Sequence, residues 1–274
     1  MSSSATLGSA SSSQSLGLTG PSGGIFQIAL RDIATLFRTP WIIISRSLAF
    51  IIQLFVFATL ISGLVPSGRV VPSFFEYYAV GSVVGTIASI SFIIGYDIFE
   101  EAEEGVLDYL LTLPVSRRQF IVGRALGGAV RAMIYIIPMF VIVAVLERFT
   151  NPLSLVAAIL DLFLLAFGVT GLSITVAVSV RSANRFDVVL ALLELAVSRA
   201  STALYPIAFM PGYVAAFAPF SPVSLAADSA RAALNPLGFS FDIIGLAGLV
   251  AFVVVFLGLG AAFYFRKLEG GVYA

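Results

Sequence analysis

The stretch DIFEEAEEGVLDYLLTLPVSRRQF, residues 97 to 120, separates two long apolar segments that carry little charge. It holds six of the fifteen acidic residues of the chain: Asp97, Glu100, Glu101, Glu103, Glu104 and Asp108. Two adjacent arginines, Arg117 and Arg118, follow these acids. We therefore expect this segment to be a water-facing connection between two elements that lie in a different solvent.

The composition identifies that solvent as a lipid bilayer. Of 274 residues, 59% are hydrophobic and 11% are charged, whereas a soluble domain is about half apolar and about a quarter charged. We expect an all-α integral membrane protein. The formal net charge of zero argues against nucleic-acid binding. The sequence contains neither cysteine nor histidine, which excludes disulfides, histidine zinc sites and Ser-His triads.

Six segments approach the roughly 20 apolar residues that a helix needs to cross a bilayer. They predict transmembrane helices over 43–65, 77–98, 120–146, 153–180, 187–207 and 243–265. Because the number is even, both ends of the chain are expected on the same side of the membrane.

The basic residues indicate which side that is. Nine lie in or beside the loops on the side of the N-terminus: Arg31, Arg38, Arg117, Arg118, Arg124, Arg181, Arg185, Arg266 and Lys267. Only Arg69, Arg148 and Arg231 lie in the opposite loops. Since basic residues concentrate in cytoplasmic loops, we predict a plasma-membrane protein with both termini in the cytoplasm.

The chain is expected to have four parts: a disordered Ser/Gly-rich tail over 1–24, a connecting helix over 25–40, a six-span membrane domain over 41–268 and a cytoplasmic tail over 269–274. In the connecting helix, Phe26, Leu30, Ile33 and Phe37 fall on one helical face. The helix is too short and too polar to span a bilayer. It is therefore predicted to be amphipathic and to lie in the headgroup plane.

The segment between the fifth and sixth predicted spans, residues 205–236, holds five of the twelve prolines and is still mostly apolar. Proline interrupts helices, and the pieces between the prolines are too short to cross. We expect short re-entrant helices on the outer side, one of them capped by Ser221 with Pro222 at its first position.

The charged loop itself has signals of local order. Gly105 permits a bend, residues 106–113 form a short amphipathic pattern, and Pro114 ends it. Ser116 and Gln119 then form a capping box at the start of the third span. Two interpretations remain: the acids are a solvated charge run, or the short helix is a docking element for a cytoplasmic partner.

The order of these parts resembles the membrane subunits of ABC-2-type export permeases, over about residues 25–268. The residues that carry the resemblance are Glu103-Glu104-Gly105, Leu110-Leu111, Pro114-Val115-Ser116-Arg117 and Gly123-Arg124. The chain departs from the family pattern at Val106, where threonine is usual, and at Arg124, where lysine is common. The segment 220–234 is similar to the family's outer segment with a late arginine, here Arg231.

The resemblance implies an exporter permease that forms a substrate conduit as a dimer, with a second copy or a paralogue. Separate ATP-binding cassette ATPase subunits would dock on a coupling helix in the loop 99–119. The sequence contains no GxxxxGK[ST] motif, so we expect ATP and Mg to bind the partner, and this chain to be neither an enzyme nor a cofactor binder. The expected docking residues are Glu100, Glu101, Glu103, Glu104, Gly105, Asp108, Pro114, Arg117 and Arg118.

Ionisable residues inside spans are costly and therefore candidates for function. Four lie deep in the predicted spans: Arg131, Asp161, Glu194 and Arg199. They either form ion pairs that fix packing, such as Asp161 with Arg131 or Arg199, or line the conduit. Arg46 and Arg124 lie near the cytoplasmic edge, where their side chains reach the interface, and receive no role. Gly81, Gly85 and Ser89 form a small-residue stripe that suits close packing.

An ion-coupled secondary transporter that works without an ATPase is the alternative. Such proteins often contain internal repeats and spans broken near the midplane. The sequence shows no convincing repeat, and its proline-rich break lies toward the outer side. The mostly apolar spans favour a hydrophobic or amphipathic substrate.

Overall fold

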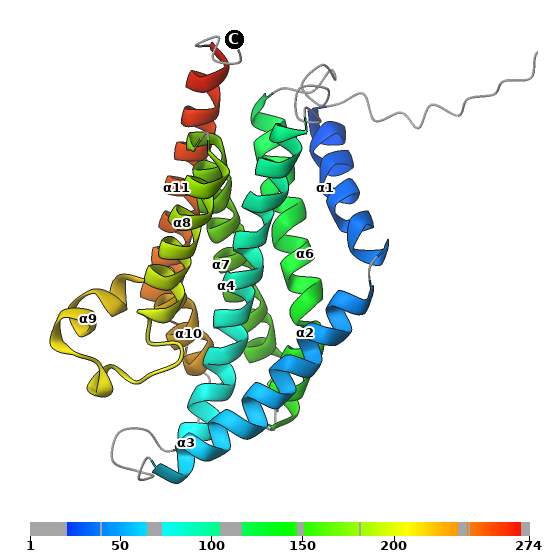
Figure 1. Cartoon of the computed structure of the whole chain (residues 1–274). Coiled ribbons are helices and arrows are strands. Elements are labelled where there is room, and N and C mark those ends of the chain that lie inside the picture. Colours follow the sequence, from blue (N-terminus) through cyan, green and yellow to red (C-terminus); the bar gives the residue numbers. More distant parts are fainter. Residues whose placement is uncertain are drawn as a thin grey trace, which may run out of the picture.

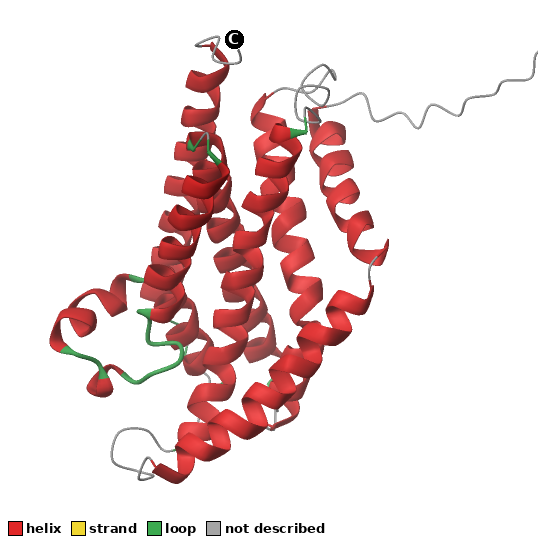
Figure 2. Cartoon of the chain, viewed as in Figure 1, coloured by secondary structure: helices red, strands yellow, loops and turns green. Residues whose placement is uncertain are grey.

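The computed structural model describes residues 21–38, 40–64, 73–104, 117–146, 151–180, 182–234, 240 and 242–269. Every regular element in this part of the chain is helical (Figure 2), in agreement with the predicted all-α class. Among the described residues, five helices are long and apolar enough to cross a membrane: Ile43–Leu64, Phe74–Glu101, Gln119–Leu146, Pro152–Ser179 and Ile243–Phe263. They coincide in position with five of the six predicted spans.

The elements follow one another as in Figure 1. The first part of the chain forms α1 (Pro21–Arg38), α2 (Pro40–Ile52), the π-helical turn η1 (Gln53–Ala58), α3 (Thr59–Leu64), α4 (Phe74–Glu103), α6 (Arg117–Leu146) and α7 (Pro152–Ser179). The second part forms α8 (Ala183–Glu194), the π-helical turn η2 (Leu195–Arg199), η3 (Ile207–Phe209), α9 (Gly212–Phe217), η4 (Ala218–Phe220), α10 (Pro222–Ala233) and α11 (Ile243–Glu269).

Helices α4 and α7 form the centre of the bundle; α6 packs against both of them, and α11 packs against α7 (Figure 1). Their apolar side chains interlock in one core that contains Ile87, Ile94, Leu165 and Val169. Hydroxyl groups add links between helices, since Ser173 on α7 donates a hydrogen bond to a carbonyl oxygen of α4 at 2.7 Å. The outward faces carry exposed apolar side chains, as expected where lipid replaces water.

The predicted span over 187–207 differs from the structure. Here α8 and η2 end at Arg199, and residues 200–206 form turns. The two helical pieces comprise 12 and 5 residues, which at about 1.5 Å per residue reach roughly 25 Å, short of a hydrocarbon core of about 30 Å. The start of α1 and the end of α11 nevertheless lie at the same end of the bundle (Figure 1).

The turn after Arg199 is held by side chains from two other helices. The Arg231 guanidinium on α10 donates to the carbonyl oxygens of Thr202 and Ala203, and the Tyr77 hydroxyl on α4 also donates to Thr202. The amide of Thr202 donates to the Ser224 hydroxyl at 2.8 Å. Non-helical backbone is tolerated at membrane depth only where protein groups satisfy it, so these contacts explain how the chain leaves the helix here.

Helix α1 packs lengthwise along the first turns of α6 (Figure 1). The approach is close, because a Cβ atom at Gly127 would lie 2.9 Å from the Cα of Ala29. Ala29 and Asp32 are buried in this contact, whereas Phe26 and Leu30 are exposed. The predicted apolar face therefore points away from the protein. Its predicted position in the headgroup plane is not confirmed.

The described part of the proline-rich segment, residues 205–234, consists of short helices and turns, as predicted from its prolines. The Ser221 side chain accepts from the amide of Val223 at 3.3 Å, and Pro222 is the first residue of α10, which confirms the predicted cap. Helix α10 packs against α4, α7 and α11. Helix α9 and its flanks project from the bundle (Figure 1) and expose Tyr213 and Phe217. Re-entry of this segment into the membrane is not confirmed.

We predict that Gly81→Ala destabilises the fold. A Cβ at Gly81 would collide with the backbone carbonyl of Ala203 and reach the Arg231 guanidinium, so the turn after Arg199 must shift, at a cost of about 1–3 kcal/mol. The measurement is the thermal unfolding midpoint of the purified protein in detergent. Gly85→Ala, one turn along α4, is the matched control, because its Cβ would have no atom within 4 Å. An equal midpoint for the two variants would contradict the prediction.

Candidate functional site

Four charged residues from three helices meet where α4 ends and α6 begins. We call Arg31 and Asp32 of α1, Glu101 of α4 and Arg124 of α6 the charge network. The Arg124 guanidinium pairs with the Asp32 carboxylate and lies 3.0 Å from a Glu101 oxygen, and Arg31 pairs with Glu101. The Arg124 and Asp32 side chains are only 3% and 6% exposed. The network thus joins α1, α4 and α6 by buried ionic contacts.

The electrostatics of the network balance internally, with two cations and two carboxylates. Burial raises the pKa of the Asp32 carboxyl, and the Arg124 guanidinium is the largest influence that lowers it. Buried charges are tolerated when each has an opposite partner, and the removal of one partner is strongly destabilising. The network can therefore hold three helices in a single relative position.

The structure describes some of the predicted docking residues and places those near this network. Glu101 belongs to it, while Glu100, Glu103 and Glu104 are exposed at the end of α4. Arg117 and Arg118 are the first residues of α6, with side chains outside the described part. Gly105, Asp108 and Pro114, and with them the predicted coupling helix, also lie outside the described residues.

The four predicted intramembrane charges are not brought together. Arg131 forms an ion pair with Asp97 of α4. Asp161 accepts a hydrogen bond from the Ser229 hydroxyl of α10 at 2.7 Å, so its partner is neither of the two arginines that the sequence suggested. Glu194 accepts from the Ser89 hydroxyl of α4 at 2.7 Å. Arg199 lies at the wall of a cavity.

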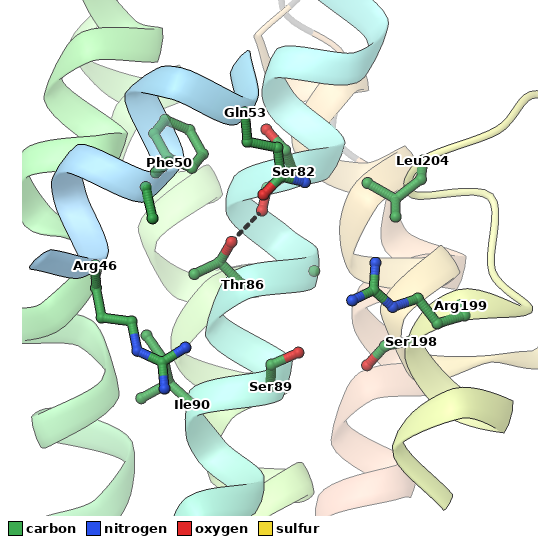
Figure 3. A pocket seen from close by; sticks show the side chains of 12 residues that line it. Arg46, Phe50, Gln53, Ser82, Thr86, Ser89, Ile90, Ser198, Arg199 and Leu204 are labelled. Atoms are coloured by element: carbon green, nitrogen blue, oxygen red, sulfur yellow. Dashed lines mark hydrogen bonds between the residues drawn. The ribbon is translucent and has the colours of Figure 1, made fainter. Parts of the chain in front are cut away.

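That cavity has a volume of about 160 Å³ and lies between α2 and η1 on one side, α4, and the end of η2 on the other side. Figure 3 shows Arg46 and Arg199 on opposite walls, with the hydroxyl-bearing face of α4 between them. We call it the polar cavity. Its lining residues are Arg46, Ala49, Phe50, Gln53, Ser82, Gly85, Thr86, Ser89, Ile90, Ser198, Arg199 and Leu204.

The sequence led us to overlook Arg124 and Arg46. Each was judged only by its distance from the membrane edge, at which a long side chain can reach the interface. In the structure Arg124 points inward to Asp32, and Arg46 lines the polar cavity. An acid such as Asp32 on a predicted interfacial helix was the available signal for the first. The sequence contained no comparable signal for the role of Arg46.

We predict that Arg124→Gln strongly destabilises the protein. The substitution leaves the buried Asp32 carboxylate without its guanidinium, at a cost of about 3–5 kcal/mol, and the unfolding midpoint in detergent should fall markedly. Arg31→Gln is the control, because Arg31 is 39% exposed and its pair is worth at most about 1 kcal/mol. Addition of Asp32→Asn to Arg124→Gln should recover part of the loss. Equal midpoints for the two single variants would contradict a central role for Arg124.

No curated protein matches the chain. The model of the family described as ABC-2 type transporter matches residues 24–235, which contain the charge network, the polar cavity and the Arg231 contacts. The match covers most of the chain and agrees with the bundle of apolar helices. This chain therefore belongs to the ABC-2 type transporter family and is a multi-pass membrane transport protein.

Proposed function

We propose that this chain is the permease subunit of an ATP-driven exporter in the plasma membrane, with its termini in the cytoplasm. Two permease chains, either two copies or one copy and a paralogue, form the substrate conduit. Separate ATP-binding cassette subunits bind ATP and Mg and dock on the loop 99–119. Family membership supports the transport role, and the charge network is the observation that supports coupling to a partner.

The position of the charge network supports a mechanical role. It lies at the two helix ends that the loop connects, since Glu101 lies at the start of the loop, in the last turn of α4, and Arg124 follows the loop in α6. A force on the loop would move α4 and α6 together, and Arg31 and Asp32 would carry α1 with them. Because α1 is followed at once by α2, the same displacement would reach the first membrane helix.

The polar cavity is the proposed part of the conduit that this displacement reaches. Its walls come from α2 and η1, from α4 and from η2. The charge network can move α4 directly, and it can move α2 and η1 through α1. The exposed carboxylates of Glu100, Glu103 and Glu104 would meet a basic surface on the ATPase.

We predict that Glu104→Lys combined with Arg117→Glu uncouples the permease from its ATPase. Reversal of both charges should weaken docking and reduce the cassette ATPase that co-purifies with a tagged permease by about tenfold or more, since hydrogen-bonded charge pairs contribute about 1.5–3 kcal/mol. The measurement is the molar ratio of ATPase to permease after co-expression with the cassette ATPase of the same source. The variant should keep the unfolding midpoint of the unaltered chain.

Glu76→Lys is the matched control, because Glu76 is an exposed acid in the first turn of the same helix α4. It lies at the opposite end from the loop, so it should leave the ATPase ratio unchanged. If the double reversal co-purifies with the ATPase as well as this control does, docking at the loop is excluded.

The ion-coupled alternative makes an opposite prediction. If the exporter proposal is right, transport in proteoliposomes that contain the permease together with its ATPase should require ATP. It should persist when proton and sodium gradients are collapsed by ionophores. The measurement is uptake of a fluorescent amphiphile into those proteoliposomes in which the ATPase faces outward. Transport by the permease alone, driven by an ion gradient without ATP, would overturn the proposal.

A further inference from the structure

The two arginines of the polar cavity lack acidic partners. Within the described residues, no carboxylate lies within salt-bridge distance of Arg46 or Arg199. The arginines in the charge network, by contrast, are all paired. Glu194 lies beside the cavity through its bond to Ser89, which leaves two guanidinium groups against one carboxylate. Both arginine side chains are exposed within the chain, and charged side chains inside a membrane span normally face a partner or a water-filled path.

The two guanidinium groups are the main donors of the cavity that stay free, whereas the hydroxyl groups that have donated their protons keep lone pairs that can accept. The polar side chains of Gln53, Ser82, Thr86 and Ser89 already use a proton within the protein. Their acceptors are, in that order, the Tyr78 hydroxyl, the carbonyl oxygens of Ala79 and Ser82, and the Glu194 carboxylate. The guanidinium groups of Arg46 and Arg199 can therefore act only as additional donors, because arginine has no acceptor.

Ser198 gives an independent indication of a ligand. This residue is 3% exposed and lines the cavity, yet its hydroxyl has no hydrogen-bond partner among the described residues. Figure 3 shows the hydroxyl directed toward the face of α4 that lines the cavity. A buried hydroxyl without a partner is costly, so its position is explained if a ligand oxygen completes the bond.

We propose that the polar cavity binds the oxyanion headgroup of the transported molecule, such as a phosphate, through Arg46, Arg199 and Ser198. An anion with only acceptor oxygens matches the donors that remain free, and the planar guanidinium group suits phosphate and carboxylate geometry. The volume of about 160 Å³ is about ten times what one buried water needs. This inference rests on the proposed function, since it assigns a substrate class to the same conduit.

The apolar surroundings complete the description of the ligand. Phe50, Ile90 and Leu204 contribute to the same walls. The outward faces of α2 and of α8 are also apolar. An ionised head attached to an apolar tail would satisfy both parts of this environment. The substrate class is therefore an anionic amphiphile.

The test compares three lipids with identical acyl chains on the purified full-length permease. Phosphatidic acid, phosphatidylcholine and diacylglycerol are titrated separately, and the dissociation constants are measured by native mass spectrometry. Phosphatidic acid should bind about tenfold more tightly than the other two, since charge-assisted hydrogen bonds are the strong ones. Equal affinity for the three lipids would overturn the proposal.

Variants assign the binding to the cavity. Arg46→Gln and Arg199→Gln should each weaken phosphatidic acid binding about tenfold, and Ser198→Ala about threefold. Arg185→Gln is the matched control, because Arg185 is an exposed arginine near the start of α8 and outside the cavity. A loss in the Arg185 variant as large as that in the Arg199 variant would show peripheral lipid binding and exclude the cavity.

Two further arms keep the result decisive. If a glutamine variant fails to purify as a single species, Arg46→Lys and Arg199→Lys retain the charge, and they should keep the preference for phosphatidic acid at reduced affinity. Reduced affinity for phosphatidic acid in the well-folded lysine and alanine variants supports the site, whereas unchanged affinity in all of them excludes it. Displacement of phosphatidic acid by inorganic phosphate would identify a free anion as sufficient, and resistance to it would identify the tailed molecule.

Failure of the headgroup-binding proposal can be distinguished from failure of the proposed exporter function. Lipid binding is measured on the permease without ATPase, and ATPase association is measured on the unaltered chain. Headgroup selectivity can fail while the ATPase still co-purifies, in which case only the substrate class is wrong. If no cassette ATPase associates, the exporter proposal fails whatever the cavity binds.

Discussion

The ion pairs of the Arg124 guanidinium, buried between Asp32 and Glu101, are the contacts on which the arrangement of α1, α4 and α6 depends. Three helices contribute to these pairs, and none of the helices can move alone without leaving a charge unpaired in a buried place. Because an unpaired buried charge costs several kcal/mol, intermediate positions are disfavoured. The three helices are expected to move as one body, which is the property that transmission of force requires.

A second anchor holds the other half of α4. Arg231 donates to Tyr77, Thr202 and Ala203 and lies over the Tyr77 ring at 3.5 Å from its centroid. Burial lowers the pKa of this guanidinium, and the nearby Tyr77 and Asp228 oppose that shift. The polar cavity lies on α4 between the two anchors. A rigid helix fixed near both ends can change the cavity by tilting, and each tilt must disturb one of the anchors.

The sequence predicted those features that depend on the solvent or on near neighbours in the chain. Apolar length located five spans, because the bilayer requires it of any helix. Ser221 and Pro222 identified the start of α10, because a cap involves only adjacent residues. The break after Arg199 was missed, since residues 200–205 contain no proline or glycine. It depends on Arg231 and Tyr77, which are distant in sequence.

The same limit explains the pattern of success among the candidate site residues. Depth in a span can be counted along the chain, so Arg131, Asp161, Glu194 and Arg199 were recognised as unusual. Their partners depend on which helices are neighbours, and a single sequence does not specify this.

The stripe formed by Gly81, Gly85 and Ser89 illustrates the point. Its spacing predicts one close-packed face, yet the structure gives its members different environments. Gly81 meets the turn at Ala203, Gly85 faces open space at the polar cavity, and Ser89 binds Glu194. Small residues on one face thus serve two purposes along the same helix. At one end they allow a backbone to approach, and one turn further they leave room for a ligand. The environment of α4 changes from close packing to open space where η2 ends. The turn after η2 fills the space beside Gly81, and the same turn follows Arg199 at the cavity wall.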